Sequence, residues 1–199
     1  MTIFTIGHST RSLDDFVALL QAHGVTQLAD IRTLPRSRRH PHFSRDALAE
    51  SLPSVAIAYR HMPELGGLRK PRRDSRNTGW RNTSFRGYAD YMETPAFAKA
   101  IDDLIAWAQR EDRRPERAAP HEAGVARPFQ GRDADTAIMC AEAVWWQCHR
   151  QLVADALVAR GLDVRHIMSA SAAPRHTLTD FARVEAGDRG LSVTYPGLL

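Results

Sequence analysis

The sequence predicts a single α/β domain in which a mostly parallel sheet is flanked by helices. The chain opens with an apolar run at 2–6, a helical pattern at 13–23 and a second apolar run at 25–31, which is the order of a β-α-β unit. A second unit of this kind occupies 136–167, so β-α-β units stand at both ends of the chain. With 199 residues, 43% of them hydrophobic, the chain can bury one sizeable core.

The first unit has clear boundaries. Residues 2–6, TIFTI, are apolar and β-branched and run into Gly7, as expected for a buried strand that enters a tight turn. Ser12 is a suitable N-cap, and Gly24 is a suitable end for the helix behind it. The apolar residues of that helix recur at helical spacing: Leu13, Phe16, Val17 and Leu20. The second strand follows at 25–31.

The middle of the chain predicts shorter elements. Ser44 is a candidate cap for a short helix that Pro53 ends, and 55–59 form a third strand. Residues 61–80 have no apolar period and predict a long loop. Thr94 and Pro95 mark the start of another helix, which continues through 97–110.

The remaining segments complete the predicted domain, 1–199. Residues 111–133 are rich in Pro, Gly, Arg and Glu and predict a flexible insertion. Strand 136–140, a helix over 143–160 and strand 163–167 form the second unit. Residues 168–199 are a C-terminal extension for which we expect one short helix and an irregular tail.

The composition favours a cytosolic protein. No basic leader precedes a long apolar stretch, and no apolar run is long enough to span a membrane, so we expect neither secretion nor a membrane partner. The two cysteines, Cys140 and Cys148, are too few for a disulfide scaffold and indicate free thiols in a reducing compartment. The sequence gives no indication of the oligomeric state.

The positive charge is concentrated in one segment. Residues 32–86 hold 13 Lys or Arg against 4 Asp or Glu, and nearly all the basic residues of the chain are arginines. Guanidinium groups suit phosphate and carboxylate groups, although a GC-rich genome gives the same preference for arginine, and charge runs are usually solvated surface. We therefore expect an anionic small molecule or a nucleic acid as partner.

Polar residues follow each predicted strand. Ligands of open α/β sheets bind beyond the carboxyl ends of the strands, so these residues are candidates for the site. The substrate-binding candidates are Ser9, Asp30, Arg32, Arg36, His61, Glu64 and Arg150. We expect Arg32, Arg36 and Arg150 to converge on one anion, with Asp30 orienting an arginine.

The densest group of reactive residues is CAEAVWWQCHR, 140–150. The catalytic candidates are His8, Cys140, Glu142, Cys148 and His149. A thiolate is stabilised near a helix N-terminus and an arginine, so Cys148 is expected to be the nucleophile or redox thiol, with Glu142 and His8 as candidate bases. Cys148 and His149 are adjacent in the expected helix and would point about 100° apart, so the partner of Cys148 should come from another loop. Burial without function is the alternative for Cys140.

The motifs for metals and nucleotides are absent. Cys140 and Cys148 are eight positions apart, there is no C-x-x-C, and the histidines form no helical pair, so we expect no bound metal. TIGHST, 5–10, is neither a Walker loop nor G-x-G-x-x-G, and we expect no cofactor.

Four motifs taken together resemble a known family. They are TIGHS at 5–9, ADIRTLPRSR at 29–38, YRHMPELGG at 59–67, and CAE with CHR at 140–150. In this order and spacing they resemble the bacterial and archaeal domain of unknown function family 488, over about residues 3–167. The resemblance implies an α/β fold and a cytosolic protein, and it implies no activity.

Two functions follow from these residues. The first is an enzyme, such as a cysteine-dependent hydrolase or transferase, that acts on a phosphate-bearing substrate, including a nucleotide or nucleic acid, through the CAE-x5-CHR site. The alternative is a non-catalytic nucleic-acid-binding module that uses the basic segment 32–86. A thiol redox sensor is a third reading of the cysteine pair.

Overall fold

The computed structural model contains a five-stranded sheet that is parallel throughout. It describes residues 1–36, 39–109, 135–187 and 190–197. The strands are β1 Thr2–Gly7, β2 Val25–Asp30, β3 Ala58–His61, β4 Asp135–Cys140 and β5 Asp163–His166. Their order across the sheet is β3-β2-β4-β1-β5, so β4 lies between β1 and β2. The predicted α/β class is confirmed.

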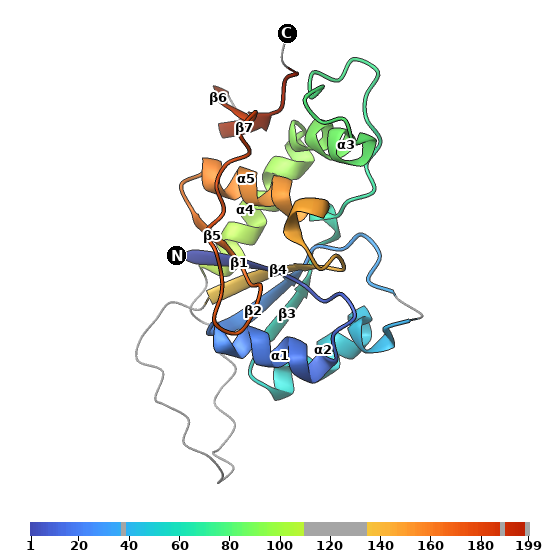
Figure 1. The fold of residues 1–199 in the computed structure, drawn as a ribbon, viewed down its shortest axis with the longest axis vertical. Helices are drawn as coiled ribbons and strands as arrows, with labels where there is room; N and C mark the ends of the chain where they lie inside the picture. The colour runs from blue at the N-terminus through green and yellow to red at the C-terminus, as the bar shows by residue number, and fades with distance from the viewer. Residues whose placement is uncertain (37–38, 110–134, 188–189, 198–199) are drawn as a thin grey trace.

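Helices cover both faces of the sheet (Figure 1). They are α1 Leu13–Ala22, α2 Arg45–Ser54, α3 Thr83–Met92, α4 Pro95–Ala108 and α5 Arg150–Ala159. Short 3-10 helices occupy Pro41–Phe43, Pro63–Leu65 and Trp145–Gln147. Helices α1 and α2 lie on one side of the sheet and α3, α4 and α5 on the other (Figure 1).

The core has two parts, one on each face, because successive strand side chains point to opposite sides of the sheet. Phe4 and Leu28 pack with Phe16 of α1, whereas Ile3 and Ala29, their neighbours in sequence, pack with α4 and α5. This alternation holds the ends of β1, β2 and β4 in register, which places their following loops side by side.

The predicted helix starts are confirmed by their caps. The side chains of Ser12, Ser44 and Thr94 each accept a hydrogen bond from a backbone N–H of the first helical turn. Pro53 lies within the last turn of α2, which ends at Ser54. The strand expected at 55–59 starts three residues later, because Ala56 adopts a positive φ of 60° after the helix.

Two expectations for the C-terminal third are wrong. The helix expected over 143–160 starts only at Arg150, because residues 145–147 form a separate turn in which Trp145 stacks on His166. The C-terminal extension holds no helix among its described residues. It forms an antiparallel hairpin, β6 Arg183–Gly187 and β7 Gly190–Thr194.

The extension is part of the folded domain. Tyr195 is fully buried and donates a hydrogen bond to Asp155 of α5, and its backbone N–H donates to Asn77. His176 also bonds to Asp155. The insertion expected at 111–133 lies outside the described residues. No helix in the described part of the chain has both the length and the apolar character needed to cross a membrane.

Candidate active site

The candidate site lies where the loops after β1, β2 and β4 meet. After β1 the chain passes to α1 on one face, whereas after β4 it passes to α5 on the other (Figure 1). Neighbouring parallel strands whose connections leave in opposite directions open a crevice at their carboxyl ends, which is the usual ligand position in this class of fold.

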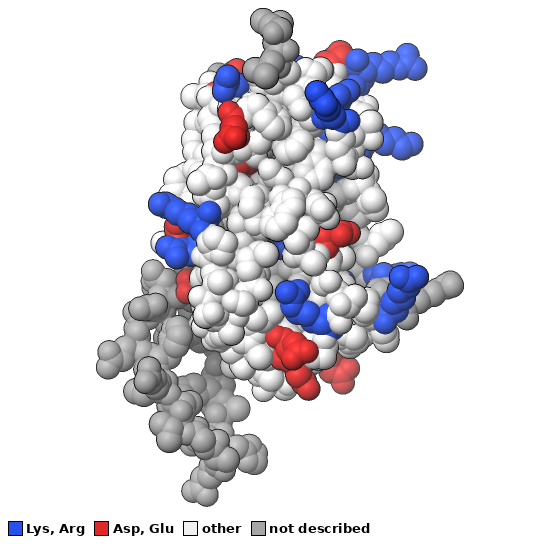
Figure 2. All heavy atoms as spheres, in the orientation of Figure 1, with Lys and Arg blue, Asp and Glu red and all other residues white. Residues whose placement is uncertain are grey.

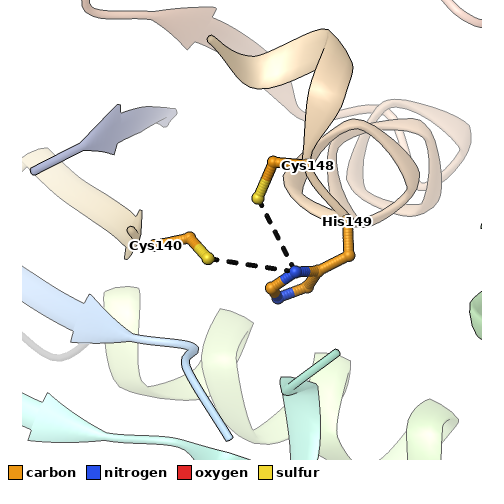
Figure 3. Close-up of side chains that lie close together, drawn as sticks. All are labelled: Cys140, Cys148 and His149. Atoms are coloured by element: carbon orange, nitrogen blue, oxygen red, sulfur yellow. Dashed lines mark hydrogen bonds between the residues drawn. The ribbon is translucent and has the colours of Figure 1, made fainter. Parts of the chain in front are cut away.

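Cys140, Cys148 and His149 meet in this crevice. The Nδ1 atom of His149 lies 3.6 Å from the Sγ atom of Cys148 and 3.9 Å from that of Cys140. Both sulfurs point toward the same ring nitrogen (Figure 3). Cys140 ends β4, whereas Cys148 and His149 immediately precede α5.

The contact between Cys148 and His149 corrects the sequence prediction. Cys148 was expected inside a helix, where its side chain would point away from that of His149. Its backbone is extended, with φ −134° and ψ 149°, and His149 is the residue before the first turn of α5. Both side chains therefore turn to the same side, and Cys140 supplies the contact from another element.

The His149 ring is held in one orientation. Its Nε2 atom lies 3.2 Å from the carbonyl oxygen of Ile31, which can only accept, so Nε2 carries the proton and Nδ1 presents a lone pair to the sulfurs. The ring packs against Tyr88 at a centroid distance of 5.1 Å. Gly67 is also close to the ring, and a Cβ atom there would come within 3.1 Å of Nδ1.

The two cysteines differ in acidity. The hydrogen bond from the Cys140 thiol lowers the pKa of Cys148 well below its usual value, and the charge of the neighbouring Arg150 lowers it further. The same hydrogen bond, together with burial, raises the pKa of Cys140 well above its usual value. The first ionisation therefore belongs to the pair of adjacent sulfurs as a unit.

The cluster opens into a cavity of about 330 Å³, which we call the thiol cavity. This volume is in the range of small-molecule sites. Its walls come from the loops after β2 and β4, the 66–68 loop and α3, and they include Thr33, Gly67, Phe85, Tyr88, Glu142 and Gln147.

A second cavity, of about 540 Å³, adjoins the first and is the basic cavity. Its lining includes His8, Ser9, Arg36, Arg39 and His40. The two cavities share Arg32, Leu34, Ala141, Glu142 and Gln147. Arg36 and Arg39 are exposed, and neither pairs with a carboxylate among the residues that the structure describes.

Arg32 and His8 are committed to internal partners. Arg32 is buried and donates to both carboxylate oxygens of Asp30. Asp30 therefore orients an arginine, as the sequence predicts. His8 donates from Nδ1 to the Ser9 carbonyl and accepts at Nε2 from Arg32. Burial lowers the pKa of His8 to about 4, and the charge of Arg32 adds to this. His8 is thus a neutral acceptor already in use and does not fit the expected role of free base.

The expected convergence of three arginines is wrong. Arg150 is 1% exposed, and its guanidinium donates to the carbonyls of Glu142 and Ala143 below the cavity floor. Gly7 leaves room for this packing, because a Cβ there would lie 1.8 Å from the Glu142 oxygen. Of the three arginines, Arg36 is the one that is both exposed and part of the basic cavity lining.

Two other candidates lie outside both cavities. His61 donates from Nε2 to the carbonyl of Arg32 and so supports the loop after β2. Glu64 is exposed, and only its backbone carbonyl is used, as acceptor for Tyr91 and Arg69.

Sequence reasoning missed the wall that α3 supplies. Phe85, Tyr88, Ala89 and Met92 stand at helical spacing behind the cap Asn82, a signal that predicts this helix. The spacing argument against a metal also fails in three dimensions. The ligand atoms of Cys140, Cys148 and His149 all lie within 4.8 Å of one another.

Comparison with protein families identifies this chain. The family described as Domain of unknown function DUF488 matches residues 12–113 and 117–157, which is most of the chain. The chain belongs to the DUF488 family. Three of the four motifs, including CAE and CHR, lie within the matched residues, and TIGHS precedes them. Comparison with curated proteins and with solved structures gave no match.

The geometry of this DUF488 site supports two kinds of chemistry. The Nδ1 lone pair of His149 can take a proton from a thiol, which makes a nucleophilic thiolate. The same three atoms can instead bind a metal ion. Glu142 is exposed at the border of both cavities, where its carboxylate can act on a substrate as acid or base.

Proposed function

We propose that this protein is an enzyme that holds an anionic substrate in the basic cavity and acts on it through the Cys140, Cys148 and His149 cluster. The observation that carries this proposal is the continuity of the two cavities, which share five lining residues. A substrate that spans both would place its charged group near Arg36 and Arg39 and its reacting group at the sulfurs.

The anion is best matched by a phosphate or carboxylate group. Arginine forks bind both groups with paired hydrogen bonds, and the two exposed arginines have no competing carboxylate partner in the described part of the chain. The charge of Arg32 is already balanced by Asp30, so the attraction comes from the outer arginines.

The site needs both thiols free. The two cysteines form no disulfide. We therefore place the enzyme in a reducing compartment such as the cytosol.

The nucleic-acid-binding alternative is less well supported. Most of the described basic side chains of segment 32–86 lie in the loop after β2 or the loop before α3, whereas Arg45, Arg60 and Arg86 lie on α2, β3 and α3. On the face shown in Figure 2 the blue groups form no continuous band. Arg72 and Arg76 are already paired with Glu93. Oligonucleotide affinity can be measured at increasing salt concentration for the wild type and for Cys148→Ser. An equally steep loss of affinity in both proteins would favour this alternative.

A thermal melt in increasing phosphate, against chloride at equal ionic strength, tests the anion site. We expect the melting temperature of the wild type to rise with the logarithm of phosphate concentration, and that of Arg36→Ala/Arg39→Ala to lose this response. The matched control is Arg73→Ala/Arg81→Ala, which removes the same charge outside both cavities. An equal response of all three proteins would overturn the proposal.

Catalysis is tested on phosphate mono- and diesters of p-nitrophenol. Turnover by the wild type should fall at least about 100-fold in Cys148→Ser, because the cluster loses one of its reacting atoms. Unchanged turnover in this variant would show that the cluster does not carry out the reaction, and would contradict the proposal.

A further inference from the structure

The distances from the His149 nitrogen to the two sulfurs match those of a tetrahedral metal site, and all three ligand atoms lie within 4.8 Å of one another. A zinc ion with Zn–S bonds of about 2.3 Å and a Zn–N bond of about 2.0–2.1 Å holds sulfur and nitrogen about 3.6 Å apart. The two sulfurs of this cluster lie 3.6 Å and 3.9 Å from the Nδ1 atom of His149. One ion at the centre of the three atoms would therefore need only small side-chain movements.

We propose that Cys140, Cys148 and His149 bind one divalent transition-metal ion of the zinc class, with the fourth coordination position open to the thiol cavity. Two thiolates and an imidazole are ligands that favour zinc over calcium or magnesium. The inference rests on the proposed function, because the open position would be the reactive centre of that enzyme.

The surroundings of His149 are those of a metal ligand. Metal-binding histidines usually donate their other ring N–H to a carbonyl or carboxylate, which fixes the tautomer and the ring orientation. The Nε2 atom of His149 makes this bond to the carbonyl of Ile31 at 3.2 Å. Tyr88 and Gly67 both lie close to the ring, which limits its rotation away from the sulfurs.

The charges around the cluster favour an anion at the open position. Two thiolates neutralise a divalent ion, which leaves the buried guanidinium of Arg150 as excess positive charge. Arg150 acts electrostatically on both cysteines and forms no ion pair within the described ranges. A hydroxide or a substrate oxyanion bound to the metal would balance this charge, which agrees with the basic cavity alongside.

The site has the composition of a catalytic metal centre rather than a structural one. Structural zinc sites are closed by four protein ligands, whereas catalytic sites have three and keep one position for water or substrate. The cluster has three ligand residues, counted over the residues that the structure describes, and all three line the thiol cavity. Glu142 lines the same cavity, and a carboxylate there can accept a proton from a water bound at the open position.

The direct test is metal binding by the whole chain. Protein purified with reductant and stripped with a chelator is titrated with Zn²⁺, and with Co²⁺ to observe thiolate-to-cobalt charge transfer and the strong visible bands of tetrahedral cobalt. We expect one equivalent to bind, with at least about 100-fold weaker binding in Cys148→Ser and in His149→Gln. The matched control is His23→Gln, a histidine at the end of α1 that lines neither cavity and bonds to the Ser169 carbonyl, and this variant should bind as the wild type does.

A second measurement needs no variant and so does not depend on variant folding. Bound Zn²⁺ should protect both Cys140 and Cys148 of the wild type from iodoacetamide, as read by mass spectrometry. Absence of stoichiometric binding, or alkylation of Cys148 at the same rate with and without Zn²⁺, would overturn the metal site and leave a free thiol pair.

The outcome is separable from that of the proposed function. Zinc binding in a protein whose melting temperature ignores phosphate would support the metal site and contradict the anionic substrate. If the melting temperature rises with phosphate only when Arg36 and Arg39 are present, and the protein binds no zinc, the anionic substrate is supported and the metal site is contradicted.

Discussion

The carboxylate of Asp30 and the guanidinium of Arg32 form a buried ion pair at the carboxyl end of β2, with 2.6 Å between Oδ2 and Nη2. Arg32 also bonds to the Phe43 carbonyl and to His8, and the Tyr59 hydroxyl donates to Asp30. One pair thus ties the loops after β1 and β2 and the turn before α2 to the sheet.

Removal of Arg32 should therefore destabilise the whole domain. Arg32→Ala leaves the Asp30 carboxylate buried without its counter-ion, and we expect the free energy of unfolding in urea to fall by about 3–5 kcal/mol. Arg36→Ala, an exposed control four residues on, should change it by less than about 0.5 kcal/mol. Equal effects of the two substitutions would contradict the assigned role of the pair.

The strand ends of the site were predictable because short-range signals determine them. Apolar β-branched runs place His8, Asp30 and Cys140 at the carboxyl ends of parallel strands, and the topology then brings them together. The pairing of Cys148 with His149 was not predictable. The sequence around 145–148 fits a helix, and only the stacking of Trp145 on His166, a contact between distant segments, shows why it forms a separate turn.

The C-terminal hairpin was not predicted, for a related reason. All five residues of β6 are exposed, so the segment carries little of the apolar alternation that marks a strand. Its anchor is Tyr195, whose partners Asn77 and Asp155 are distant in sequence. Gly187 and Gly190, at the facing ends of β6 and β7, were the available local signal.

Gly7 should tolerate no side chain. A Cβ atom at this position would lie 1.8 Å from the Glu142 carbonyl oxygen, so Gly7→Ala must displace the loop after β4. We expect a loss of about 1–3 kcal/mol in unfolding free energy, measured by urea titration. At Gly187 the nearest atom to an added Cβ is 3.9 Å away, so Gly187→Ala is the control. A neutral Gly7→Ala would show that this loop is not packed as described.

Tyr195 should contribute to stability through its hydroxyl group. Tyr195→Phe removes a 2.8 Å hydrogen bond to the buried Asp155 carboxylate, and we expect a loss of about 1.5–3 kcal/mol in unfolding free energy. In the control, Tyr91→Phe, the lost bond is to an exposed backbone carbonyl, and the change should stay below about 0.5 kcal/mol. If both variants behave alike, the extension contributes less to the fold than its contacts indicate.

Acid should destabilise the protein through His166. This residue bonds through Nδ1 to Thr5 and through Nε2 to His176, which in turn contacts Asp155. Burial, followed by the charges of His176 and Arg150, lowers the pKa of His166 to about 3. In the unfolded chain a histidine titrates near 6.5.

The sign of the effect follows from proton uptake. Between pH of about 6.5 and about 3 the unfolded state binds a proton at position 166 that the folded state does not, so the free energy of unfolding falls as the pH falls. The slope is at most about 1.4 kcal/mol per pH unit for this group, and the loss sums to about 2 kcal/mol between pH 7.5 and 5.

Urea titrations of the wild type and of His166→Gln at pH 7.5 and 5 measure this contribution. Gln retains groups that can bond to Thr5 and His176 but cannot titrate, so its loss of stability on acidification should be smaller by about 2 kcal/mol. Titrating groups that do not contact position 166 are common to both proteins and cancel in the comparison. An identical pH dependence would mean that His166 takes up its proton equally in the folded and unfolded states, which its burial among Thr5, Trp145 and His176 argues against.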